Sequence, residues 1–430
     1  MRSYGDIWRN IISDEALLMA WRRVRRGHSS SLEVAEFEGR LEEALCELQG
    51  ELESGRYVPS GYRRFRIFDP KPRTISCAPV RDRIVHHALC SVISPILERS
   101  FIHNSFACRE GKGAHRACTL ARRYCGMGGY WCKMDIRRYF DSVSHDRLLD
   151  VLLPIFREKP VRDLIEGIVR HPVPLMQKGF GLPIGNLTSQ WFANAFLDEF
   201  DHLAQTGFGK GGVRYIRYMD DFVFFAPSKS LVWEMRDRSA QWLAAKRNLD
   251  LKEEATIVSP VSEPLPFLGL RILSGSWRLS HARLSRVRRT FADRTRSYED
   301  GILPESRYAM CAASSDGAHR WFGFKGILKD KDLALVKKRA EAGSNRVLRG
   351  GNWNNDANNA KSSNRNNNTP SNRNNNYGFR LSSTLPGYCQ GPAQSAGAPC
   401  MMETNMRMSG RKVAFAKSSP AIFKEIVYEK

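Results

Sequence analysis

A run of strand-forming residues from Tyr215 to Phe225 is interrupted by Met219-Asp220-Asp221. Aromatic and β-branched residues on both sides of a short polar break predict a hairpin with two carboxylates at its tip. A third aspartate, Asp135, lies near the end of another predicted strand, residues 130–136. Carboxylates between apolar strands raise one another's pKa unless a cation neutralises them, so the pattern favours a divalent metal site. The alternative is an exposed turn, in which aspartate is common.

The chain is strongly basic. Its 67 Lys and Arg residues exceed its 45 Asp and Glu residues and give a formal charge of +22, which excludes an acidic disordered protein. Such a charge favours a polyanionic partner, although it could also only solubilise the surface. No run approaches the length of a membrane span, the start is polar, and the 10 cysteines form no CxxC pair. We therefore expect a cytoplasmic protein without membrane contact.

Local patterns predict alternating helices and strands over the first 342 residues. The expected order is a helical segment over 1–55, a hairpin over 62–76, a helix over 80–96, a strand over 130–136, helices to about 171, a loop over 172–185, a helix capped by Asn186 or Thr188, the hairpin over 215–225, a strand over 267–273, and basic helices over 275–342. The arrangement predicts a mixed α+β protein.

The composition changes abruptly at Gly343. Between Asn345 and Asn376 there are 14 asparagines, separated mainly by Arg, Ser and Gly. Such a segment cannot bury enough apolar surface to order itself, so we expect a poorly ordered tail.

Several blocks together resemble the reverse transcriptases. They are Lys71-Pro72-Arg73 followed by residues 81–89, Lys133-Met134-Asp135 with Tyr139-Phe140, residues 181–190 (GLPIGNLTSQ), Tyr218-Met219-Asp220-Asp221, and Phe267-Leu268-Gly269. The resemblance covers about residues 60–275 and implies a right-hand polymerase that catalyses RNA-directed DNA synthesis.

The resemblance implies a division of the chain. The N-terminal helices and fingers occupy 1–125, the palm with its antiparallel sheet occupies 126–273 with a finger-type helical insertion at about 145–175, and a helical thumb occupies 275–342. An Asn-rich segment, 343–385, and a disordered tail, 386–430, follow.

The resemblance also assigns roles to matching positions. Asp135, Asp220 and Asp221 would be catalytic and would bind two Mg²⁺ ions, or Mn²⁺ in their place, with the Ile136 carbonyl as an extra ligand. The nucleotide-binding positions would be Lys71, Arg73, Phe140, Pro183, Ile184, Gly185 and Gln190, and Phe267, Leu268 and Gly269 would form the primer grip.

Three of these positions have a specific expected effect. Phe140 would exclude a ribose 2′-hydroxyl, although it could be an ordinary core aromatic, and Arg73 would grip the triphosphate through its forked guanidinium. Ile184 stands where retroviral enzymes carry glutamine, so discrimination between nucleotides should fall. Ala255 occupies the usual place of a lysine that protonates pyrophosphate; Lys252 is an alternative, and the general acid stays unassigned.

The phrase Gly185-Asn186-Leu187-Thr188-Ser189-Gln190 and the tail resemble the diversity-generating retroelement branch. Residues 346–353 (RVLRGGNW) and 377–381 (YGFRL) resemble the formylglycine-generating-enzyme type of C-type-lectin fold, which many variable proteins of that branch use. Every asparagine codon begins with two adenines. The asparagine-rich tail could therefore be encoded by a template repeat, an RNA segment whose adenines the enzyme of that branch copies with errors.

That branch implies an RNA template, a DNA or RNA primer, deoxynucleotides and a small basic helical accessory protein as partners, in a bacterial, archaeal or phage-encoded system. Two other hypotheses remain. One is a group II intron-like or defence-associated reverse transcriptase of ordinary fidelity, and the other is a basic RNA-binding protein with an inactive palm.

Overall fold

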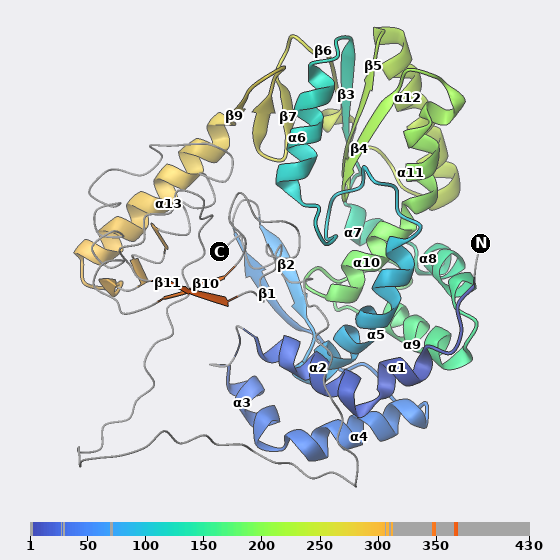
Figure 1. The fold of residues 1–430 in the computed structure, drawn as a ribbon, viewed down its shortest axis with the longest axis vertical. Coiled ribbons are helices and arrows are strands. Elements are labelled where there is room, and N and C mark those ends of the chain that lie inside the picture. Colours follow the sequence, from blue (N-terminus) through green and yellow to red (C-terminus); the bar gives the residue numbers. More distant parts are fainter. Residues whose placement is uncertain are drawn as a thin grey trace. The chain divides into compact units, whose positions relative to one another are not determined.

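The computed structural model describes residues 3–26, 28, 31–68, 72–305, 307–308 and 311–312, together with the backbone of 346–349 and 365–368. The chain divides into two compact units between Ser280 and His281. The first unit carries the expected fingers and palm (Figure 1).

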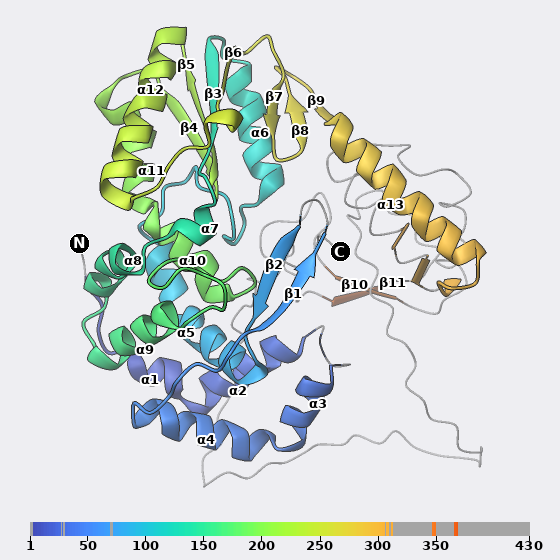
Figure 2. The ribbon, with the colours of Figure 1, turned by 180° about the vertical axis from the view of Figure 1, so that it is seen from behind.

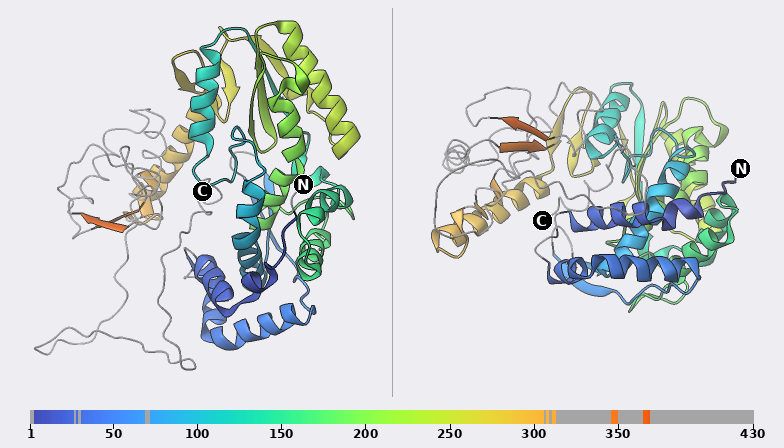
Figure 3. Two further views of the ribbon diagram at one scale, coloured as in Figure 1. Left: turned by 45° about the vertical axis from the view of Figure 1, so that its right-hand side comes forward. Right: turned by 60° about the horizontal axis from the view of Figure 1, so that its bottom comes forward.

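The N-terminal segment is helical, as predicted. Its helices are α1 (Trp8–Ile12), α2 (Asp14–Arg25), α3 (Leu32–Gly39) and α4 (Leu41–Glu53), and they lie together at one end of the first unit (Figure 3). Ser13 caps α2 by accepting a hydrogen bond from the Ala16 N–H. The buried face of α2, which includes Leu17 and Trp21, packs against the helix formed by Val80–Glu98.

The fingers hairpin and its supporting helix also agree with the prediction. Strand β1 (Arg63–Ile67) pairs antiparallel with β2 (Arg73–Cys77), and α5 (Val80–Glu98) follows. Most of α5 is buried, because it packs on both α2 and a central helix, α10 (Leu187–Phe196).

The first unit also contains several shorter helices. They are α6 (Ala114–Cys125), α7 (Tyr139–Ser142), α8 (His145–Leu152), η1 (Leu153–Ile155), α9 (Lys159–Arg170), α11 (Asp198–Gln205) and η2 (Gly207–Gly209). Asn186 occupies the N-cap position of α10, but its side chain makes no capping bond. It instead accepts from the Ala78 N–H and donates to the Ser76 carbonyl, so it ties α10 to the fingers strand β2.

The palm is an antiparallel sheet in the order β4-β5-β3-β6. Its strands are β3 (Tyr130–Asp135), β4 (Arg214–Tyr218), β5 (Asp221–Ala226) and β6 (Ile257–Pro260). Between β5 and β6 the chain forms α12 (Lys229–Trp242), the π-helical turn η3 (Leu243–Arg247) and η4 (Glu253–Ala255). The hairpin and the strand before Asp135 are therefore confirmed.

Both faces of the sheet are covered. Phe222 of β5 contacts Phe200 of α11, whereas Phe225 points to the other face and contacts Tyr124 of α6. Burial on both faces explains why β5 is continuously apolar after Asp221 rather than alternating.

A three-stranded sheet beside α6 closes the first unit (Figure 2). Its strands are β7 (Leu265–Phe267), β8 (Leu270–Ile272) and β9 (Trp277–Leu279). The single strand expected over 267–273 is wrong, because Leu268 and Gly269 have φ of +49° and +76° and turn the chain into a hairpin. The helix expected from residue 275 begins only at His281.

The second unit contains α13 (His281–Glu299), which is basic and buries Phe291 against Tyr308. The part of the expected thumb after residue 312 lies outside the described residues, and so does most of the tail. Within the Asn-rich segment, β10 (Arg346–Arg349) and β11 (Arg365–Asn368) pair antiparallel. Among the described residues, no helix is long and apolar enough to cross a membrane.

The fold class is confirmed as α+β, with helices around an antiparallel polymerase palm.

Candidate active site

The tip of the β4–β5 hairpin presents the two adjacent aspartates. Tyr218 pairs with Asp221, which leaves Met219 and Asp220 as the two turn residues. Met219 adopts φ of +58°, in the left-handed region that is uncommon outside glycine. The Asp220 carbonyl accepts a hydrogen bond of 3.2 Å from the Ile136 N–H. This bond joins the hairpin tip to the chain directly after Asp135.

The third aspartate faces the hairpin from the neighbouring strand. Asp135 lies directly opposite Asp221 in the β3–β5 ladder, so their side chains leave the same face of the sheet. Lys133, two residues earlier, is on that face too, and its Nζ lies 3.0 Å from Asp221 Oδ1. The Lys133 side chain is only 13% exposed, so this ion pair is shielded from solvent.

Burial raises the pKa of both hairpin carboxyls. The pKa of Asp220 rises to about 6, first through burial and then through the charge of Asp135. The pKa of Asp221 rises to about 7, mainly through burial, and Lys133 opposes the rise. An additional positive charge would therefore stabilise the ionised form of both carboxyl groups.

The expected nucleotide-binding loop lies against the fingers. The Ser76 N–H donates to the Ile184 carbonyl at 2.9 Å. Gly185 has φ of +116°, and a Cβ there would lie 2.8 Å from Ile75 Cγ2, so glycine is required by conformation and by space. The Arg73 charge lowers the pKa of Asp220, which places this fingers arginine in electrostatic reach of the aspartates.

Other expected residues are arranged around this loop. Phe140 is half-buried, and its carbonyl accepts from the Leu182 N–H at 2.7 Å, which brings it next to the loop. Pro183 is buried and Gln190 is half-buried on α10. Lys71 lies outside the described residues. Phe267 ends β7, and Leu268 and Gly269 form the turn to β8.

Lys252, the alternative general acid, comes close to the site through its backbone. Its N–H donates to the Asp135 carbonyl at 2.8 Å, and the side chain is half-buried. Ala255, at the expected lysine position, ends the short turn η4.

Sequence reasoning missed two buried groups. Lys133 was not assigned a role, although a lysine two residues before an aspartate on a strand must share its face. Arg217 was also missed; an arginine inside an aromatic strand was the available signal, and the side chain is fully buried against Asp201.

The carboxylates fit a divalent cation by chemistry. They are hard oxygen donors, and the Asp135 charge raises the pKa of both Asp220 and Asp221. In the described chain no three acidic, histidine or cysteine side chains already meet in a closed set of metal ligands. To bind an ion, the three carboxylates would have to move closer together, and the ion pair between Lys133 and Asp221 would have to break.

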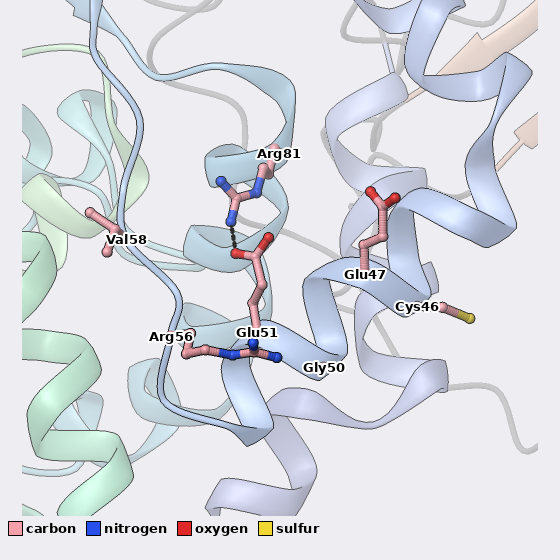
Figure 4. Close-up of a pocket in the computed structure, with 7 residues that line it drawn as sticks. All are labelled: Cys46, Glu47, Gly50, Glu51, Arg56, Val58 and Arg81. Atoms are coloured by element: carbon pink, nitrogen blue, oxygen red, sulfur yellow. Dashed lines mark hydrogen bonds and ion pairs between the residues drawn. The ribbon is translucent and has the colours of Figure 1, made fainter.

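A pocket in the described chain lies away from the aspartates. It measures about 630 Å³ and is lined by residues of α4, α5 and the segment between α4 and β1, among them Glu47, Arg56 and Arg81 (Figure 4). Arg81 is ion-paired with Glu51 across it. None of its lining residues is among those expected to be catalytic.

Two family models match the chain. Residues 68–272 match the "Reverse transcriptase (RNA-dependent DNA polymerase)" family, and residues 314–385 match the "Sulfatase-modifying factor enzyme 1-like domain". The second match begins within the segment expected to be the thumb and covers residues that lie mostly outside the described ones.

Curated proteins also resemble this chain. Protein YkfC of Escherichia coli is 26% identical over 288 residues, which are 57% of this chain and 76% of that protein. The group II intron-encoded protein LtrA of Lactococcus lactis is 20% identical over 302 residues, 55% of this chain and 50% of LtrA. The putative COX1/OXI3 intron 1 protein of Saccharomyces cerevisiae is 25% identical over 166 residues, and the chain spans only 20% of its length.

Proposed function

We propose that the chain is an RNA-directed DNA polymerase that copies RNA into DNA at Asp135, Asp220 and Asp221, because residues 68–272 match the reverse transcriptase family. The observation that carries this assignment is the position of the three aspartates: Asp135 lies opposite Asp221 in the β3–β5 ladder, and Asp220 is the turn residue directly before Asp221. The ions would be two Mg²⁺, for which Mn²⁺ can substitute, held by these carboxylates with the Ile136 carbonyl beside them. When bound, they would activate the primer 3′-hydroxyl and stabilise the leaving pyrophosphate.

The remaining residues bind and orient the substrates. Arg73 would pair with phosphate oxygens of the incoming nucleotide, and Lys71 would assist from the same hairpin. Phe140 would exclude the 2′-hydroxyl, while Pro183, Ile184, Gly185 and Gln190 would shape the surface under the base pair. The turn Phe267-Leu268-Gly269 would contact the primer, and the basic helix α13 would follow the template–primer backbone.

Lys133 has a separate role in this proposal. Its ammonium neutralises Asp221 until the metal binds, because two carboxylates on directly opposed strand positions would otherwise repel each other. The ion pair thereby keeps the hairpin closed on β3 between catalytic cycles.

We further propose that the enzyme serves diversification. It would copy a template-repeat RNA with errors at adenines, together with a small basic helical accessory protein, in the cytoplasm of a bacterial, archaeal or phage-encoded system. Ile184 supports reduced discrimination. The match of 314–385 to the sulfatase-modifying factor type of domain supports the resemblance of the tail to a variable protein segment.

A second candidate is favoured by the similarity to LtrA, a group II intron-encoded protein. In that case the enzyme would copy its RNA with ordinary fidelity. The two candidates predict different error spectra on the same template.

The test is to sequence the cDNA made from a defined RNA that contains all four bases in equal numbers. Diversification predicts substitutions concentrated opposite template adenines, and equal error rates at the four bases would refute it. The DNA sequence around the gene provides a second test. A near-copy of codons 343–385 that differs mainly at adenines would support the template-repeat reading, and a search that finds none would count against it.

A further inference from the structure

Arg217 is a fully buried arginine in the middle of the aromatic strand β4. A buried charge is tolerated only with partners. Its Nε and Nη2 each donate to Asp201 of α11 at 2.6 Å, which is a two-pronged ion pair. Nη1 donates to Asn194 Oδ1 of α10 at 3.1 Å. The guanidinium is thus held in one orientation by two helices.

The same Nη1 reaches the catalytic turn. It donates to the Met219 carbonyl at 2.9 Å. Met219 carries the unfavourable positive φ of the hairpin tip, a conformation that persists only where surrounding contacts impose it.

The peptide on the other side of Asp220 is also anchored. The Asp220 carbonyl accepts from the Ile136 N–H at 3.2 Å. Both peptide groups that flank the Asp220 Cα therefore have fixed partners, one from Ile136, directly after β3, and one from Arg217. With its backbone held on both sides, the direction in which the Asp220 carboxylate leaves the chain is set.

We propose that Arg217, oriented by Asp201 and Asn194, is a positioning residue that fixes the Met219 peptide and thereby aims the Asp220 carboxylate at the metal and the reacting phosphate. The inference rests on the proposed catalytic role of Asp220. It connects α10 and α11, which lie behind the palm, to the geometry of the catalytic turn.

The proposal differs from a purely structural role, in which Arg217 would only fill the core. A structural role predicts that activity falls only as far as the folded fraction falls. A positioning role predicts a loss of kcat and of metal affinity in a protein that is folded. Because the side chain is fully buried and cannot touch substrate, KM for the nucleotide should stay at the wild-type value.

The chain offers a matched control in Arg247. This arginine is also buried, donates from Nε to the Phe196 carbonyl at 2.7 Å, and is ion-paired through Nη2 with Glu199 at 2.8 Å. It makes no hydrogen bond to the catalytic turn in the described chain. Arg247→Met therefore removes a buried guanidinium of the same kind without releasing Met219.

The experiment compares full-length wild type with Arg217→Met, Arg217→Lys, Asp201→Asn and Arg247→Met. Folding is followed by circular dichroism, kcat and KM by primer extension, and Mn²⁺ affinity by electron paramagnetic resonance of the free ion without nucleotide. A displaced reacting group typically costs about 100-fold in rate, and we expect a kcat loss of this order in Arg217→Met. Lysine cannot serve Asp201 and Met219 together, so Arg217→Lys should not restore kcat although it keeps the charge.

Weakened Mn²⁺ binding and low kcat in folded Arg217 variants, with wild-type values in Arg247→Met, would support the proposal. If Arg217→Met does not fold, Asp201→Asn decides, because it keeps the guanidinium but loosens its orientation, and it should show a smaller loss of the same kind. Wild-type kcat and Mn²⁺ affinity in the folded Arg217 and Asp201 variants would overturn the inference, as would equal losses in Arg247→Met. If the Asp220→Ala variant kept polymerase activity, that result would instead refute the proposed catalytic role of Asp220, on which this inference rests.

Discussion

Asp135 and Asp221 occupy directly opposed positions of two antiparallel strands, with the Lys133 ammonium 3.0 Å from one of them. The arrangement places like charges close together in the palm, and Lys133 and Arg73 partly offset them. Metal affinity and apo-protein stability are therefore linked through the same carboxylates.

The first prediction concerns pH and stability. The folded protein holds protons on Asp220 and Asp221 up to about pH 6 and pH 7, whereas an unfolded chain releases them near pH 4. The folded state binds more protons in this window, so the free energy of unfolding falls as pH rises from about 4 through about 7. Urea unfolding in EDTA should show this decline in wild type and a shallower one in Asp220→Asn/Asp221→Asn. Parallel pH profiles for the two proteins would contradict the assignment.

The second prediction concerns Gly185. Gly185→Ala imposes a positive φ on alanine and drives its Cβ into Ile75, so the loop should separate from β2. We expect a destabilisation of about 1–3 kcal/mol and a raised KM for the nucleotide. Gly128 provides the control, because it has φ of +81° but nothing within contact of an added Cβ. Gly128→Ala should lose stability without a change in KM; an equal rise in KM in both variants would show that loop placement is not the cause.

The third prediction concerns Phe140. If this half-buried ring excludes the 2′-hydroxyl, Phe140→Ala should lower the preference for deoxynucleotides over ribonucleotides on the order of 10- to 100-fold. The ratio of kcat/KM for the two nucleotide classes measures this. A core role alone would lower both values together and leave their ratio unchanged.

The fourth prediction concerns Ile184. Its link to the fingers runs through its backbone carbonyl, so Ile184→Gln should keep the Ser76 hydrogen bond. A polar side chain at this position should reduce misincorporation opposite adenine while kcat/KM for the correct nucleotide stays close to wild type. Sequencing of cDNA from one template would measure the change. An unaltered error spectrum would remove Ile184 from the account of fidelity.

Local sequence patterns were sufficient to predict the hairpin that carries Asp220 and Asp221. Aromatic and β-branched residues on both sides of a two-residue break leave few alternatives to a tight turn. The local pattern, which predicted a single strand over 267–273, missed the turn at Leu268 and Gly269, because a leucine with positive φ has no sequence signature.

Long-range contacts were beyond sequence reasoning for a different reason. The partners of Arg217 are 16 and 23 positions away, at Asp201 and Asn194, and only the packing of α10 and α11 behind β4 brings them together. Likewise Asn186 was expected to cap α10, yet its amide bonds to Ser76, 110 positions away. Tertiary partners displaced the local capping preference there.

The most direct test of the central claim is primer extension on an RNA template by Asp220→Ala/Asp221→Ala, with RNA affinity measured on the same samples. Asp146→Ala/Asp150→Ala is the control, since it removes two exposed carboxylates from α8 and changes the net charge equally. We predict that extension vanishes in the first variant, persists in the second, and that both bind RNA at least as well as wild type. Extension at the wild-type rate by Asp220→Ala/Asp221→Ala would contradict the assignment of this hairpin as the catalytic centre.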